Sequence, residues 1–135
     1  MKQIKHQKQG DRDCVCTCIA MIAGIKKRII RNRYHDRYMN EHNFKEDKIL
    51  DDLGIKYTTC NNSTVIKGKV YLATVPSINM LGYFHQVIID ARESMQVFDP
   101  NRGVKGRNYY VTKVSPTSSK QIKMHSWILD YEIYL

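Results

Sequence analysis

The sequence predicts an α+β fold in which N-terminal helices pack on a mostly antiparallel C-terminal sheet. Apolar residues recur at helical spacing as far as Gly54, whereas the rest of the chain consists of β-branched and aromatic runs separated by turn residues. Helices first and strands second are typical of α+β proteins. A chain of 135 residues can bury about two-thirds of its unfolded surface, so we expect residues 1–135 to form one domain.

The first predicted helix begins near Asp13 and is buried. Asp11 and Asp13 are available as N-cap or first-turn acids, and Gly24 ends or interrupts the helix. Its apolar residues at helical spacing are Cys14, Cys18, Met21, Ile22 and Ile25.

Two further helices are expected before Gly54. The second is amphipathic and strongly basic, with six Lys and Arg residues between positions 26 and 37 around apolar residues and tyrosines. The third closes at Gly54, a residue suited to a helix C-terminus. Its apolar positions are Phe44, Ile49, Leu50 and Leu53.

Six strands are expected after Gly54. Turn signals such as Asp99-Pro100-Asn101 separate the runs that predict them. These runs are residues 55–59, 70–75, 84–90, 95–98, 109–114 and 127–135. The weakly patterned stretch 117–123 is expected to be a loop.

The composition points to a cytoplasmic protein with reduced thiols. No stretch approaches the roughly 20 apolar residues that cross a bilayer, and the polar N-terminus lacks the apolar segment of a secretory signal. Three of the four cysteines, Cys14, Cys16 and Cys18, crowd into five residues, which suits no ordinary disulfide framework. The net charge of +9 favours a nucleic acid or an acidic protein surface as partner.

Cys14 is the residue that most suggests chemistry. It would open a buried helix, where unpaired amides and the helix dipole favour a negatively charged thiolate. Taken alone, such a cysteine is more often a small core residue. The neighbouring sequence therefore has to decide between the two interpretations.

The surroundings of Cys14 match a known pattern. A glutamine stands a few residues upstream, Asp13-Cys14 follows, and the next segment reads Cys18-Ile19-Ala20-Met21-Ile22. The second half contains Thr74-Val75-Pro76-Ser77, Gly82, His85-Gln86-Val87-Ile88 and Val97-Phe98-Asp99-Pro100. In this order the segments resemble the bacteriocin-processing (double-glycine) peptidases and their stand-alone phage and bacterial relatives, a branch of the papain-like cysteine peptidases. Val15 stands where that family commonly has glycine.

The resemblance implies a papain-like fold and a thiol protease that needs no cofactor and acts on a peptide or protein substrate. Cys14 would be the nucleophile, His85 the general base and Asp99 the group that orients the histidine. A glutamine side chain and the backbone N–H of Cys14 would bind the oxyanion. Gln9 and Gln7 stand five and seven residues before Cys14, on either side of the usual spacing of six. We take Gln9 as the main candidate and Gln7 as the alternative.

The chemistry of these residue types agrees with the implied roles. A thiol needs a base to accept its proton, and imidazole has an unperturbed pKa near neutrality. His85 lies in an apolar strand and would be held rigidly. A hairpin through residues 92–94 would bring Asp99 within reach of it, where a carboxylate fixes the tautomer of the imidazole. Asn101 is the backup for this orienting role.

The sequence disfavours one other function, zinc binding, and leaves two more open. The cysteines and five histidines are zinc-ligand types, but no Cys-x-x-Cys or His-x₃-His pair occurs, so no metal is expected. The basic helix, with Tyr34 and Tyr38, could make the chain a nucleic-acid-binding module. A papain-like scaffold without activity could instead bind a protein partner.

Overall fold

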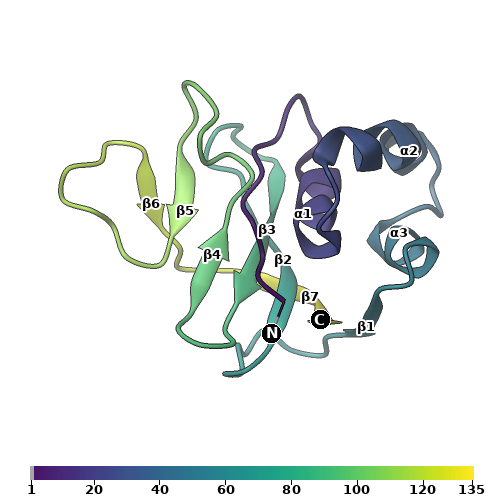
Figure 1. The fold of residues 1–135 in the computed structure, drawn as a ribbon. Helices are drawn as coiled ribbons and strands as arrows, with labels where there is room; N and C mark the ends of the chain where they lie inside the picture. The colour runs from purple at the N-terminus through teal and green to yellow at the C-terminus, as the bar shows by residue number, and fades with distance from the viewer. Residues whose placement is uncertain (1) are drawn as a thin grey trace.

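The structure, a computed structural model, describes residues 2–135 and begins with three helices. The helices are α1 (Cys14–Ala23), α2 (Lys27–Asn40) and α3 (Glu46–Asp52). The strands are β1 (Lys56–Thr59), β2 (Val70–Pro76), β3 (Phe84–Asp90), β4 (Gln96–Phe98), β5 (Tyr109–Val111), β6 (Gln121–Lys123) and β7 (Ile128–Tyr134). The helices gather at one end of the molecule and β5 and β6 project at the other (Figure 1).

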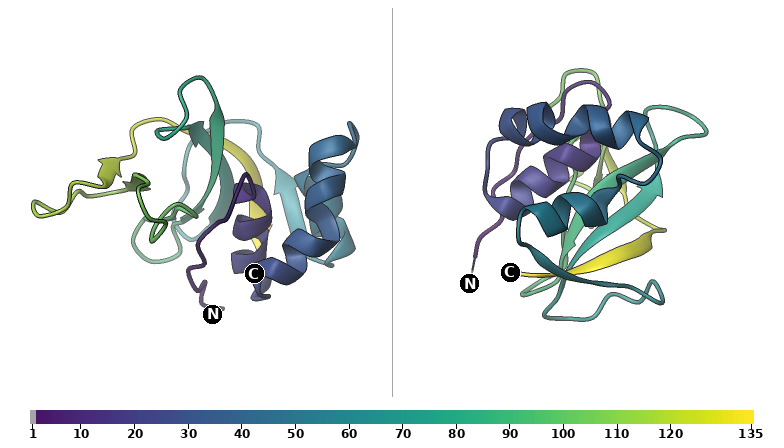
Figure 2. Two further views of the ribbon diagram at one scale, coloured as in Figure 1. Left: turned by 90° about the horizontal axis from the view of Figure 1, so that it is seen from above. Right: turned by 90° about the vertical axis from the view of Figure 1, so that its right-hand side faces the viewer.

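The main sheet has the strand order β1-β7-β2-β3-β4, and all its neighbouring strands are antiparallel. The α+β class with a mostly antiparallel sheet is therefore confirmed. Figure 2 shows the three helices together on one side of this sheet. No helix within residues 2–135 is long and apolar enough to cross a membrane.

The predicted loop at residues 117–123 is wrong in part. Gln121–Lys123 forms β6, which pairs in parallel with β5. A run of three residues with one apolar side chain carries no strand pattern, so its conformation depends on the partner strand. The predicted strand at 109–114 ends at Val111, because β6 offers β5 only three residues to pair with.

The helix α1 is buried on all sides, as expected for the predicted first helix. Its eight residues from Val15 to Ile22 are buried, and it packs against both α2 and β3. The helix ends at Gly24, whose φ of 71° is the left-handed conformation that glycine adopts freely. Gly24 donates its N–H to the carbonyl of Ala20.

Asp13 occupies the N-cap position but does not cap α1 with its side chain, which corrects the expected capping role. Its backbone (φ −113°, ψ 31°) departs from the extended geometry of a capping residue. The buried carboxylate instead accepts the N–H of Gly10 at 2.7 Å and the Nε of Arg31 at 2.9 Å. Asp13 thus ties the segment before α1 to α2.

The sheet separates two apolar clusters, because successive residues of β2 point to opposite faces. Val70 and Leu72 pack with the helices, whereas Tyr71, Ala73 and Val75 pack on the other face. Both faces of β2 and β3 are therefore covered. This packing fixes the start of β3 relative to the N-terminus of α1, where the candidate site lies.

Candidate active site

Four of the six residues predicted for the site line one cleft of about 350 Å³. They are Gln9, Cys14, His85 and Asn101. Cys14 is the first residue of α1 and is half-buried. Of the four cysteines, all free thiols, it is the one that lines this cleft.

A contact between α1 and β3 holds Cys14 and His85 in register. The Cys18 thiol donates to the backbone carbonyl of Gln86 at 3.4 Å, one residue after His85. The Gln86 side chain in turn donates to the carbonyl of Ala73 on β2 at 2.6 Å. Since Cys18 lies one helical turn after Cys14, this contact brings the N-terminus of α1 toward the start of β3.

His85 and Asp99 form a buried pair. His85 Nε2 lies 2.6 Å from Asp99 Oδ1, and the two side chains are 6% and 0% exposed. Because an ionised carboxylate can only accept, Nε2 carries the hydrogen of this bond. Nδ1 is then the ring nitrogen left without this bond, on a residue that lines the same cleft as Cys14.

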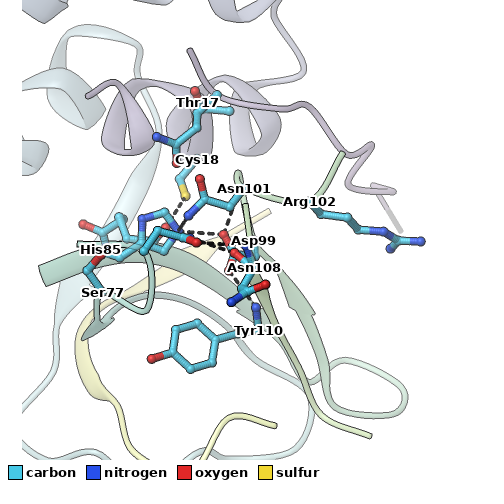
Figure 3. A network of polar contacts seen from close by, with 12 residues as sticks. Thr17, Cys18, Ser77, His85, Asp99, Asn101, Arg102, Asn108 and Tyr110 are labelled. Carbon is cyan, nitrogen blue, oxygen red and sulfur yellow. Dashed lines mark hydrogen bonds and ion pairs between the residues drawn. The ribbon is translucent and has the colours of Figure 1, made fainter. Parts of the chain in front are cut away.

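Asp99 is itself held by the backbone around it (Figure 3). Its Oδ1 accepts the N–H of Asn101 at 2.8 Å, and its Oδ2 accepts the N–H of Tyr110 at 2.8 Å. These bonds stabilise the ionised carboxylate and fix its position. The turn after β4 and the start of β5 therefore build the support for His85.

The environment of His85 favours its charged form. Burial by itself lowers the pKa of the imidazole, but the hydrogen bond with Asp99 and then the nearby Cys14 side chain oppose it and raise the pKa to about 9. At neutral pH the ring is therefore an imidazolium.

Asn101 lies beside the pair but does not orient the imidazole. Its Nδ2 is 3.4 Å from His85 Nε2, which already uses its hydrogen toward Asp99. Among residues 2–135, the buried Oδ1 of Asn101 has no hydrogen-bond partner. Asn101 itself is one of the residues that line the cleft.

The two candidate glutamines lie in different places. Gln9 lines the cleft, its backbone N–H donates to the carbonyl of Pro100 at 2.8 Å, and its Nε2 makes a 3.3 Å bond to the carbonyl of Gly10. Gln7 instead accepts the N–H of Lys27 at 2.7 Å and donates to the carbonyl of Ile25 at 2.8 Å. Gln9 thus lies at the cleft that Cys14 lines, whereas Gln7 caps α2.

The other cysteines have environments that suppress the thiolate. Burial, then the charge of Asp13, raises the pKa of Cys16 to about 12. Burial also raises the pKa of Cys18 well above its ordinary value and that of Cys60 to a smaller extent. Within residues 2–135 no group of three or more His, Cys, Asp or Glu side chains could hold a metal ion.

Several residues of the cleft were not predicted from the sequence. Glu46 of α3 accepts the hydroxyl of Tyr38 at 2.8 Å, and both side chains line the cleft. Arg107 lines it from the turn before β5, and Arg12 does so in the left-handed conformation, with φ 55°. Arg107 falls in a stretch without acids, and this one-sign stretch is a signal that the sequence offers for a functional surface. Nothing in the sequence marks Glu46 as a residue of the cleft.

Comparisons of the chain with protein-family models, with curated proteins and with solved structures found no match. The residues of the cleft and their geometry are therefore the basis of the functional proposal.

Proposed function

We propose that this chain is a papain-like cysteine peptidase that hydrolyses peptide bonds through Cys14, His85 and Asp99. The observation that carries the proposal is the meeting of a helix-first thiol with a buried His–Asp pair in one cleft. A cysteine-first helix packed against an antiparallel sheet also agrees with a papain-like fold, which is part of the proposal.

In the first half-reaction the Cys14 thiolate attacks the carbonyl carbon of the substrate. A C–S bond forms and the carbonyl electron pair moves to the oxygen. The amides of the first turn of α1 have no acceptor within the helix, and Gln9 Nε2 has a second hydrogen, so both can donate to this oxyanion. The C–N bond then breaks and His85 protonates the leaving amine through Nδ1, which leaves an acyl-enzyme.

In the second half-reaction the neutral His85 removes a proton from water. The resulting hydroxide attacks the thioester, the C–S bond breaks, and the acid product leaves. The thiolate and the imidazolium are thereby restored. Asp99 keeps Nε2 protonated throughout and stabilises the positive charge of the ring.

The basic helix α2 has structural contacts that account for most of its cations. Lys27 and Arg31 lie 3.5 and 2.9 Å from Asp13, Arg33 faces Asp52, and Arg37 pairs with Glu41. The Arg37 guanidinium also stacks on the ring of Phe44 at 3.9 Å. These contacts do not favour α2 as a nucleic-acid-binding surface.

The proposal is tested by incubating the protein with the peptides of a digested proteome and identifying new termini by mass spectrometry. Wild type and Cys60→Ala, which changes a half-buried thiol outside the cleft, should generate the same new termini. Cys14→Ala should generate none. Failure of the wild type to cleave any peptide, or cleavage that persists in Cys14→Ala, would contradict the proposal.

A further inference from the structure

The net positive charge of the chain comes from two segments without acids, residues 1–10 and 100–129. Together they contain nine Lys and Arg residues, while the rest of the chain has 13 of these and 13 Asp and Glu. The two segments therefore account for the whole net charge of +9. Their cations are Lys2, Lys5, Lys8, Arg102, Lys105, Arg107, Lys113, Lys120 and Lys123.

The two segments lie against each other although they are far apart in the sequence. The N–H of Gln9 donates to the carbonyl of Pro100 at 2.8 Å, and His6 Nε2 lies 2.8 Å from the carbonyl of Arg102. In Figure 1 the N-terminal segment rises in front of the main sheet, past β3 and β4, before it enters α1. The fold thus brings the two acid-free segments into contact, and we call the nine cations that they carry the basic surface.

The cations of the basic surface are not neutralised within the structure. Eight of the nine are exposed and Arg107 is half-buried. Among the described residues none of them forms an ion pair, in contrast to those of α2. A one-sign surface of this kind attracts anions and raises their local concentration.

The basic surface reaches the cleft at Arg107. Two hydrogen bonds hold the neighbouring Asn108 to Asn79 of the β2–β3 loop, at 2.8 and 2.9 Å, so the wall that carries Arg107 is fixed. Arg12 adds a second cation to the lining, and the one acid lining the described cleft, Glu46, lies on α3. The cleft lining therefore carries two arginines and one acid, and Arg107 belongs both to this lining and to the basic surface.

We propose that the basic surface binds an acidic segment of the polypeptide substrate while the scissile bond lies at Cys14. This inference rests on the proposed peptidase function and names the substrate class. A polypeptide is favoured over a nucleic acid because the aromatic side chains within the two segments, Tyr109, Tyr110 and Trp127, are buried or half-buried. The exposed Tyr83 and Phe84 lie outside these segments and line the cleft at Cys14. Tyr110 is buried, and Trp127 donates its Nε1 hydrogen to the carbonyl of Ser63 at 2.9 Å.

The test measures binding to Cys14→Ala protein, which cannot turn the substrate over, by fluorescence anisotropy. The probes are a labelled peptide of alternating Glu and Ser and its Gln-Ser counterpart. Three cations of the surface are changed together in the variant R102Q/K105Q/R107Q. The matched control R28Q/K56Q/K67Q removes the same charge from cations without an ion pair elsewhere on the described surface.

The Glu peptide should bind about tenfold more tightly than the Gln peptide, because several exposed charge pairs, each weak by itself, add up to this factor. The variant at the basic surface should lose that preference, while the control retains it. Equal binding of both peptides, or equal loss in the control, overturns the inference. Stronger binding of single-stranded RNA at equal probe charge also overturns it, in favour of a nucleic-acid surface.

This inference and the proposed function fail separately. Charge-specific peptide binding at the basic surface without any Cys14-dependent hydrolysis would refute the peptidase while the surface stands. Hydrolysis that proceeds without charge-specific binding would refute the acidic-substrate inference while the peptidase stands. Thermal melting of each variant checks that the substitutions leave the fold intact.

Discussion

His85 is the residue on which the proposed chemistry depends most strongly. Its imidazole is buried, yet its pKa is raised to about 9 because the hydrogen bond to Asp99 and the nearby Cys14 side chain outweigh the opposing effect of burial. A buried imidazolium without an adjacent carboxylate would be unstable. Asp99 is therefore the residue that decides the charge of His85.

Replacing Asp99 with Asn should lower the pKa of His85 to its ordinary value near 6.5 or below, because burial then acts without the main opposing bond. Peptide hydrolysis should fall by roughly 10²-fold or more, since the imidazole loses its tautomer and orientation. An NMR titration of the histidine signals measures the pKa. Asp90→Asn, which breaks the pair with Arg92 outside the cleft, is the matched control and should leave His85 unchanged.

At the scale of single elements, the structure distinguishes two glutamines that the sequence left as alternatives. One lies at the N-terminus of α2 and the other at the cleft. Gln7 supplies an acceptor to the first turn of α2, which has no cap from its own N-cap residue, Lys26. Gln9 lines the cleft. The same substitution at these two positions should therefore have opposite consequences.

We expect Gln7→Ala to lower the free energy of unfolding by about 1 kcal/mol, as for the loss of a helix cap, with turnover little changed. Gln9→Ala should leave stability nearly unchanged and lower turnover on the order of 10²-fold. Urea unfolding and peptide hydrolysis of the two variants, measured side by side, provide the check. A loss of turnover in Gln7→Ala alone would reverse the assignment.

The elements that local chemistry defines could be predicted from the sequence. The start of α1 at Cys14 and its end at Gly24 follow from apolar spacing and a left-handed glycine. The strand β6 could not be predicted, because Gln121–Lys123 is held by pairing with β5 and by the 2.9 Å bond from the N–H of Met124 to the carbonyl of Val111. These contacts depend on the tertiary arrangement.

The candidate site shows the same division. Cys14, His85 and Asp99 could be proposed from short motifs, and the hairpin of β3 and β4 brings the last two together. The support of Asp99 by the N–H of Tyr110 could not, because it requires the chain to return from the turn after β4. The choice between Gln9 and Gln7 also depends on which side chain faces the cleft.

At the scale of the whole molecule, the raised pKa of His85 links stability to pH. The folded state binds the proton more tightly than the unfolded state, in which the pKa is near 6.5. The pair with Asp99 therefore contributes its full stabilisation below pH 6.5 and loses it as the pH rises through about 9. The contribution is about 3 kcal/mol at most.

The free energy of unfolding should therefore decrease as the pH rises above 6.5 in Cys14→Ser protein, where no thiol proton is released to offset the proton that His85 takes up on folding. Adding His85→Gln to this protein should flatten the decrease, whereas adding His42→Gln, at an exposed position, should not. Urea unfolding at a series of pH values measures the effect. A Cys14→Ser profile that is level or rises over this interval would show that His85 is not held as an imidazolium.

The central claim, that Cys14 is an activated nucleophile, is tested most directly by competition between two thiols of one molecule. Cys60 is half-buried like Cys14 but lies outside the cleft. With limiting iodoacetamide near neutral pH and peptide mapping, Cys14 should react at least roughly tenfold faster than Cys60. His85→Ala should remove that advantage. If Cys14 reacts no faster than Cys60, or is indifferent to His85, the account is contradicted.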